Sequence, residues 1–92
     1  MITVITTMKW DLQALAKYNR MLNLIPIFHR GLAQEVVNKK AEQNAIDRAS
    51  AQVEETDIVA AFMAEVPKAF YSLMIRIMDE AGLDYKKYGA GK

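Results

Sequence analysis

The sequence predicts a small all-α protein, an orthogonal bundle of about four helices in one domain over residues 1–92. Apolar residues recur at three- and four-residue steps in four segments, the period of a helix with one buried face. Two prolines, Pro26 and Pro67, each follow an aliphatic residue and separate these segments. A chain of 92 residues with 52% hydrophobic residues can form one core and is too short for a second.

The first helix is expected from about Asp11 to Leu22, after a short extended segment. Residues 2–7 are all β-branched, which favours extended backbone over helix, although a frayed terminus fits the same composition. Asp11 is a suitable N-cap residue because its carboxylate can accept a hydrogen bond from the first turn.

The second helix is expected to begin at Pro26 and to end near Asn44. Proline forces Ile25 out of the helical region and is itself suited to a first helical position. Ile25 and Phe28 are predicted to wedge against the first and third helices. Gly31 lies inside this helix at a cost of about 1 kcal/mol relative to Ala, so it is either a close helix contact or a tolerated glycine.

Residues 45–53 are expected to form a connection, with a helical turn possible at its alanines. A third helix follows from about Glu55, because acidic side chains gather at its electropositive N-terminal end. Pro67 predicts a corner and the start of a fourth helix. That helix is expected to stop at Gly82, which can adopt the left-handed conformation, and residues 84–92 are predicted to be a mobile tail.

The fourth helix is predicted to be an interaction surface. Eight of the ten residues from 69 to 78 are apolar, and a helix that is apolar nearly all round must be covered on most sides. Three shorter helices are expected to cover one face. The surplus predicts self-association or binding of a larger protein through Phe70, Tyr71, Leu73, Met74, Ile75, Ile77 and Met78.

Composition argues against several kinds of chemistry. The chain has no cysteine and a single histidine, His29, with no acidic residue one helical turn away. Neither a thiolate or two-ligand metal site nor a local catalytic dyad is encoded, and no glycine-rich phosphate loop is present. We therefore expect no metal, no cofactor and no independent enzyme activity.

Charge and targeting signals point to a cytoplasmic protein. Twelve basic and eleven acidic residues give a net charge of +1, so nucleic acid is an improbable partner. The N-terminus lacks the basic region and apolar core of a secretory signal. The apolar run from 69 to 78 is about half the length of a membrane span and contains Arg76.

One motif resembles a known family. The run Ile25-Pro26-Ile27-Phe28-His29-Arg30-Gly31, followed by a helix and a second helix entry at 53–61, resembles the small C-terminal domain of the light-independent protochlorophyllide reductase B subunit. The family pattern has an aliphatic residue, Pro, Phe, Arg and Gly at these spacings, and the resemblance covers about residues 10–64.

The chain departs from that family at several positions. Glu54 replaces the usual Thr cap, Asn38 replaces a mid-helix acid, and the connection at 45–53 is longer. The fourth helix lies outside the resemblance. In the parent enzyme the domain is an appendage of a subunit that binds tetrapyrrole, and the catalytic body is missing here. The resemblance thus implies a stand-alone relative that contacts a reductase-like protein or its substrate.

Three functions follow as hypotheses. The first is a non-enzymatic interaction module, homo-oligomeric or bound to a larger redox enzyme. The second is a tetrapyrrole-binding accessory protein that uses His29 and Arg30. The third is a histone-like DNA-binding dimer, suggested by a long helix between shorter ones. For Arg30, an ion pair with an internal acid such as Asp57 is favoured over a partner or propionate carboxylate.

Overall fold

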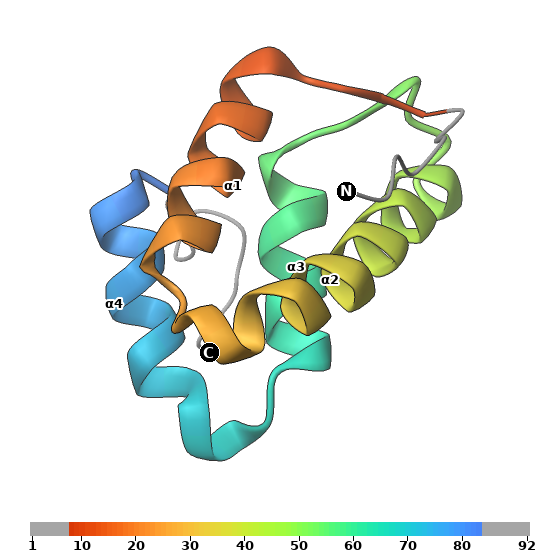
Figure 1. Ribbon diagram of the computed structural model, residues 1–92. Coiled ribbons are helices and arrows are strands. Elements are labelled where there is room, and N and C mark those ends of the chain that lie inside the picture. The colour runs from red at the N-terminus through yellow and green to blue at the C-terminus, as the bar shows by residue number, and fades with distance from the viewer. Residues whose placement is uncertain (1–7, 84–92) are drawn as a thin grey trace.

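Helices dominate the fold, as the sequence predicts. The computed structural model describes residues 8–83, so the predicted extended segment at 2–7 and the tail at 84–92 lie outside the described residues. The elements in chain order (Figure 1) are β1 (Lys9–Trp10), α1 (Leu12–Leu24), α2 (Ile27–Asp47), β2 (Gln52–Val53), α3 (Glu55–Glu65), the 3-10 turn η1 (Lys68–Phe70) and α4 (Tyr71–Ala81).

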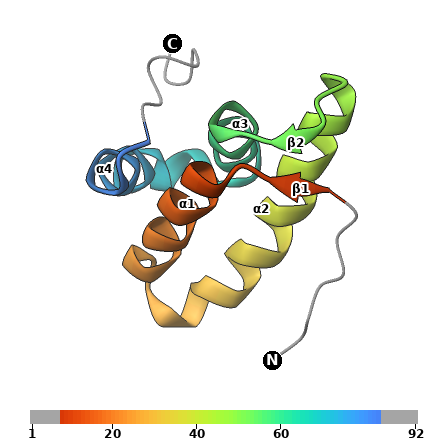
Figure 2. The same cartoon turned by 90° about the horizontal axis from the view of Figure 1, so that it is seen from above.

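Two short strands tie the start of the chain to the connection between α2 and α3. β1 and β2 pair in parallel, with Trp10 opposite Val53, and the backbone N–H of Asp11 donates to the carbonyl of Val53 at 2.9 Å. Figure 2 shows the pair lying beside the second half of α2. Two-residue strands are too short to show a period, so the sequence predicts only a connection here.

The predicted helix boundaries are correct to within a few residues. Asp11 caps α1, since its Oδ2 accepts from the backbone N–H of Ala14 at 2.9 Å. Helix α2 ends at Asp47 instead of Asn44, because the completely buried Ala45 packs in the core and carries the helix on. At 21 residues, α2 is the long helix between the shorter α1 and α3.

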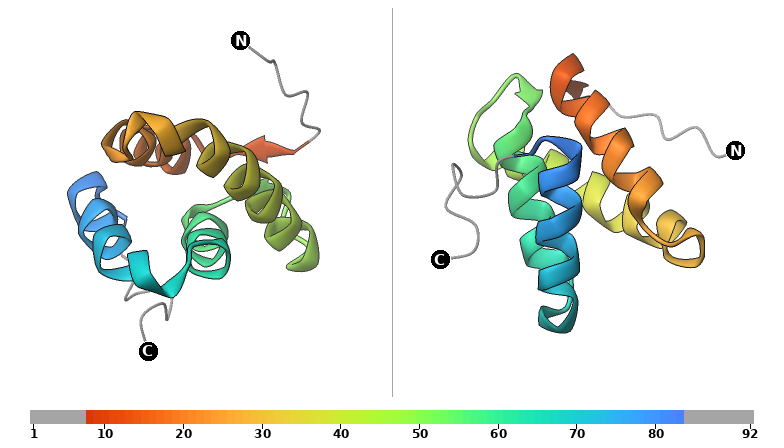
Figure 3. Two further views of the ribbon diagram at one scale, coloured as in Figure 1. Left: turned by 60° about the horizontal axis from the view of Figure 1, so that its bottom comes forward. Right: turned by 90° about the vertical axis from the view of Figure 1, so that its left-hand side faces the viewer.

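A sharp corner and a glycine stop define the last helix. The axes of α3 and the η1–α4 segment differ by 120° at Pro67, which confirms the predicted corner (Figure 3). Gly82 ends α4 with a φ of 85°, and the backbone N–H of Leu83 donates to the carbonyl of Met78 at 2.9 Å. Leu83 is buried there, as a Schellman-type stop predicts.

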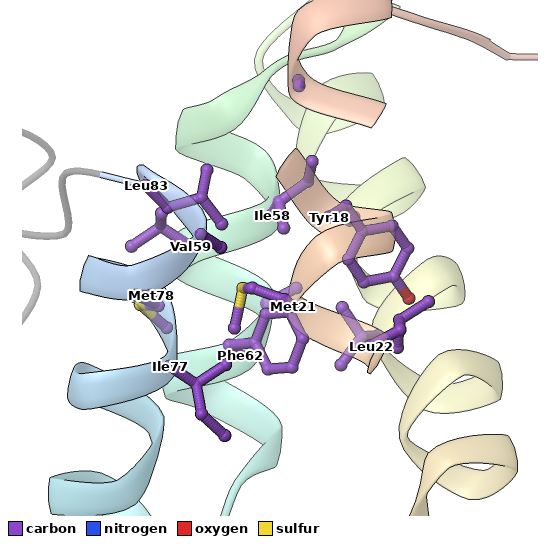
Figure 4. Packing of buried hydrophobic residues seen from close by; sticks show 14 of the residues in the cluster. Tyr18, Met21, Leu22, Ile58, Val59, Phe62, Ile77, Met78 and Leu83 are labelled. Atoms are coloured by element: carbon purple, nitrogen blue, oxygen red, sulfur yellow. The ribbon is translucent and has the colours of Figure 1, made fainter. Parts of the chain in front are cut away.

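The core lies between α1, α3 and α4, with the second half of α2 closing one side. Figure 4 shows side chains from α1, α3 and α4 pointing toward one another, with Phe62 and Met21 near the centre. Three aromatic rings contact one another in succession along one side of this core. Trp10 stacks on Tyr18 with ring centroids 5.4 Å apart, and Tyr18 meets Phe62 edge-on at 5.9 Å. Such pairs add about 0.5–1.5 kcal/mol each beyond their buried area.

Tyr18 should make the fold sensitive to alkaline pH. Its hydroxyl donates to Asn38, and burial raises the pKa of Tyr18 above the ordinary value of about 10. Below pH 10 Tyr18 is protonated in both the folded and the unfolded chain, so its full contribution to the free energy of unfolding is present. Above pH 10 only the unfolded chain ionises, and stability should fall by up to about 1.4 kcal/mol per pH unit.

Urea titrations between pH 8 and 11 test this expectation for Tyr18. The Tyr18→Phe variant is the control, because it keeps the ring and removes the ionisable group. Its stability should fall less steeply with pH than that of the wild type, and parallel curves would show that Tyr18 does not titrate differently in the two states.

Two glycines should respond to alanine in opposite directions. A Cβ added at Gly31 meets nothing within 4 Å, so the predicted alternative of close helix packing at this residue is wrong. Gly31→Ala is expected to stabilise the protein by about 0.5–1 kcal/mol through helix propensity. Gly82→Ala should destabilise it by about 1–2 kcal/mol, because φ at this position is positive. Thermal unfolding of both variants checks the two signs.

Among the described residues, no single helix has the length and apolar character needed to cross a membrane. Helix α3 and the η1–α4 segment reach that threshold only when taken together, as a pair bent by 120°.

Candidate protein-interaction surface

An apolar groove lies between the first half of α2 and the corner formed by the end of α3, η1 and the start of α4. Its volume is about 390 Å³. The residues that line it are Ile25, Pro26, His29, Leu32, Ala33, Val36, Val37, Phe62, Glu65, Val66, Pro67, Phe70, Leu73 and Met74. His29 and Glu65 are the only ionisable side chains among them, so hydrophobic contact dominates what the groove can offer a partner.

Large exposed apolar side chains surround this groove. Phe28 is 93% exposed, Leu32 is 65% exposed, and Phe70 is 53% exposed. We define the apolar face as Phe28, Leu32, Val36, Phe70 and Leu73: the last four line the groove, and Phe28 lies one helical turn before Leu32. With about 150–200 Å² for a fully exposed large side chain, their exposed fractions correspond to roughly 500 Å² of apolar surface.

The crossing of α2 explains why this surface stays open. The buried residues of α2 are Val37, Ala41 and Ala45, which lie from its midpoint onward, and α2 packs against α3. None of the buried residues of α2 falls within 27–36. That stretch nevertheless carries an aliphatic or aromatic residue at nearly every third or fourth position, so a helix face of core composition is left uncovered.

The seven residues that the sequence places in an interface on the fourth helix differ in how exposed they are. Ile77 and Met78 are buried within the chain itself, so placing these two on a contact surface is wrong, whereas Met74 is buried but lines the groove. The reason is that the buried residues of α4 lie on one face, at positions 74, 77, 78 and 81, and this face points toward side chains of α1 and α3 (Figure 4). Tyr71 and Ile75 are half-buried. Only Phe70 and Leu73 belong to the apolar face.

The residues of the family motif also differ in their burial. Ile25 is buried in the core, as expected for a wedge, whereas Phe28 points to solvent and the prediction that it wedges against neighbouring helices is wrong. The physical reason is that Phe28 lies in the first turn of α2, where no residue is buried. Pro26 and His29 line the groove.

Arg30 closes the corner between α1 and α2. Its Nη2 donates to the carbonyls of Asn23 and Ile25 at 3.2 and 3.0 Å, and these carbonyls belong to the C-terminal end of α1. The expected ion pair with Asp57 is wrong. A guanidinium at a helix C-terminus satisfies carbonyls that lack a helical partner and opposes the negative end of the helix dipole. Arg30 therefore has a structural role in this arrangement.

Asp57 is instead paired with Arg48, a contact that the sequence does not predict. Arg48 Nε and Nη2 donate to the two carboxylate oxygens of Asp57 at 3.0 and 2.8 Å, and Nη2 also donates to Glu54 at 2.9 Å. These hydrogen bonds, first of all the one with Asp57, raise the pKa of Arg48. The available signal was a cation six residues before the acidic start of the third helix. Arg48 is thereby held by acidic side chains of its own chain, at the surface of the fold.

The described residues contain no group of three or more His, Asp or Glu side chains placed to hold a metal ion. A second, more polar hollow of about 350 Å³ continues from the groove and is lined by Val36, Lys39, Lys40, Gln43 and Glu65. The rim of the apolar face therefore carries both signs of charge. No known protein family, curated protein or solved structure matches this chain.

Proposed function

We propose that this protein is a non-enzymatic helical interaction module whose binding surface is the apolar face with its groove. The observation that carries the proposal is the size of that face. Roughly 500 Å² of apolar surface is as large as the largest patch of a typical monomer, about 300–600 Å², and such a patch is often functional. A groove at its centre suits the side chains of another protein.

The resemblance of residues 10–64 adds a candidate partner to this proposal. A larger redox protein of the reductase kind is one occupant of the groove, and a second copy of the chain is the other. Two residues of the family motif, Pro26 and His29, line the groove. A partner that recognises the motif would meet it at this surface.

A photo-crosslinking residue at Leu32, introduced in cells of the native host, tests the proposal. The matched control is Leu12, which has the same side chain, is 81% exposed and lies on α1 outside the groove. We expect one protein to be joined at position 32 and none at position 12. The joined protein, once purified, should bind the wild type and not Leu32→Glu. Equal labelling at both positions, or none, would contradict the proposal.

A second candidate, a tetrapyrrole-binding accessory protein, rests on His29 in the groove. His29 lines an apolar groove, so its imidazole would be the axial ligand of a flat, hydrophobic pigment that inserts one edge into the groove. Arg30 contributes less than the sequence suggests, since it is held by the carbonyls of Asn23 and Ile25. Titration with haem or a chlorin should shift the pigment's absorption, and His29→Ala should abolish the shift.

A further inference from the structure

We propose that the occupant of the groove is a second copy of this chain, in a two-fold dimer that each copy enters with the first half of its α2. This inference rests on the proposed function and assigns its partner. The ridge formed by Phe28, Leu32 and Val36 of one chain lies in the groove of the other. Each chain therefore contributes one ridge and one groove to the dimer.

The ridge and the groove suit each other because of helix geometry. Phe28, Leu32 and Val36 are spaced four residues apart, so they form one row along α2. Rows with this spacing fit into grooves beside other helices, and the pairing of two such rows is the commonest helix contact in globular proteins. The groove runs along the flank of α2 itself. One chain therefore carries both halves of a self-complementary contact, which is what two-fold symmetry requires.

The volumes agree with this arrangement. A cavity of about 150 Å³ accommodates a benzene ring, so a groove of about 390 Å³ has room for roughly two large side chains. The ridge offers Phe28 and Leu32, both more than half exposed, as those side chains. A partner with a smooth or polar surface would leave the groove empty.

The area and the charge also favour a second copy. Roughly 500 Å² of apolar surface on each chain agrees with the apolar part of one partner's share in a standard stable interface, since that share is about 800 Å² and roughly 56–65% of it is apolar. A net charge of +1 gives little repulsion between copies. The rim carries Glu65 together with Lys39 and Lys40, and a two-fold contact can pair opposite charges of this kind.

Sedimentation equilibrium of the purified full chain tests the proposal. The wild type should have twice the chain mass of 10.4 kDa at micromolar concentration. Leu32→Glu should raise the dissociation constant at least about 100-fold, because it places an unpaired charge in a buried contact. Phe28→Glu, at a still more exposed position, should do the same. Leu12→Glu should leave the mass unchanged, and circular dichroism should show all three variants folded.

Single cysteines test the symmetry, since the chain has no cysteine of its own. Only a residue near the two-fold axis lies close enough to its own copy for a disulfide, with Cα atoms within about 7 Å. Under mild oxidation we expect rapid disulfide-linked dimers from cysteine at one or two positions in 27–36. Leu12→Cys should give none.

The outcomes separate this inference from the proposed function. A monomer at all concentrations, or a dimer that Leu32→Glu leaves intact, overturns the two-fold contact. If that monomer is still crosslinked through position 32 to a different protein in the host, the interaction module stands and its partner is not a second copy. If neither contact is found, both proposals fail.

Discussion

Phe62→Ala is expected to lower the free energy of unfolding by about 3–5 kcal/mol, whereas Phe28→Ala should change it by less than about 0.5 kcal/mol. Phe62 is fully buried, meets the ring of Tyr18 edge-on and forms part of the groove floor. Its removal leaves a cavity in the centre of the core. Phe28 is exposed, so truncation of its side chain removes few contacts within the chain.

Urea titrations of the two variants check this difference. A domain of this size is expected to have a total stability of roughly 5 kcal/mol or somewhat more, so Phe62→Ala should be largely unfolded near 37 °C. Titrations at two protein concentrations separate a loss of intrinsic stability from a loss of association at Phe28. Similar stability losses in the two variants, independent of concentration, would show that the described burial is incorrect.

Asp57→Ala should destabilise the fold by about 2–4 kcal/mol. The Asp57 carboxylate is almost fully buried, accepts two hydrogen bonds from Arg48, and accepts a third from the backbone N–H of Glu54 at 2.9 Å. Its removal leaves that N–H unsatisfied at the start of α3 and deprives Arg48 of its buried partner. Asp57→Asn should cost less, because the amide oxygen can still accept at the cap.

The control for Asp57 is Asp47→Ala, a substitution at an exposed aspartate near the end of α2. It should change stability by less than about 0.5 kcal/mol. A double-mutant cycle of Asp57→Ala with Arg48→Ala should give a coupling energy above about 1 kcal/mol. A coupling near zero would mean that the cap alone carries the effect of Asp57.

The helix boundaries are the part of the fold that short-range chemistry determines. Asp11 caps its helix through an atom three residues away, Pro67 excludes the helical conformation from the residue before it, and Gly82 stops α4 by its own backbone freedom. Each of these effects involves only neighbouring residues. They can therefore be recognised in one sequence without knowledge of the tertiary contacts.

The partners of charged and aromatic side chains depend on how the helices cross. Arg30 and Arg48 are both suited to pair with the acidic residues at the start of α3. Only Arg48 contacts Asp57, whereas Arg30 donates to the carbonyl of Ile25. Likewise, Phe28 and Phe62 both occupy helical positions suited to a core, and only Phe62 is buried. Periodicity identifies an apolar face of a helix but does not say which neighbour covers it.

The sequence by itself determined four helices, their caps and stops, the corner at Pro67 and the presence of more apolar surface than one small core can bury. Only the tertiary structure decided where that surplus lies. The sequence favours the fourth helix, but most of the apolar residues of α4 lie on a face that is buried in the core, and the first half of α2 is left open instead. The reason is geometric: α2 meets α3 with its second half, so its first half extends beyond the core and exposes its apolar residues.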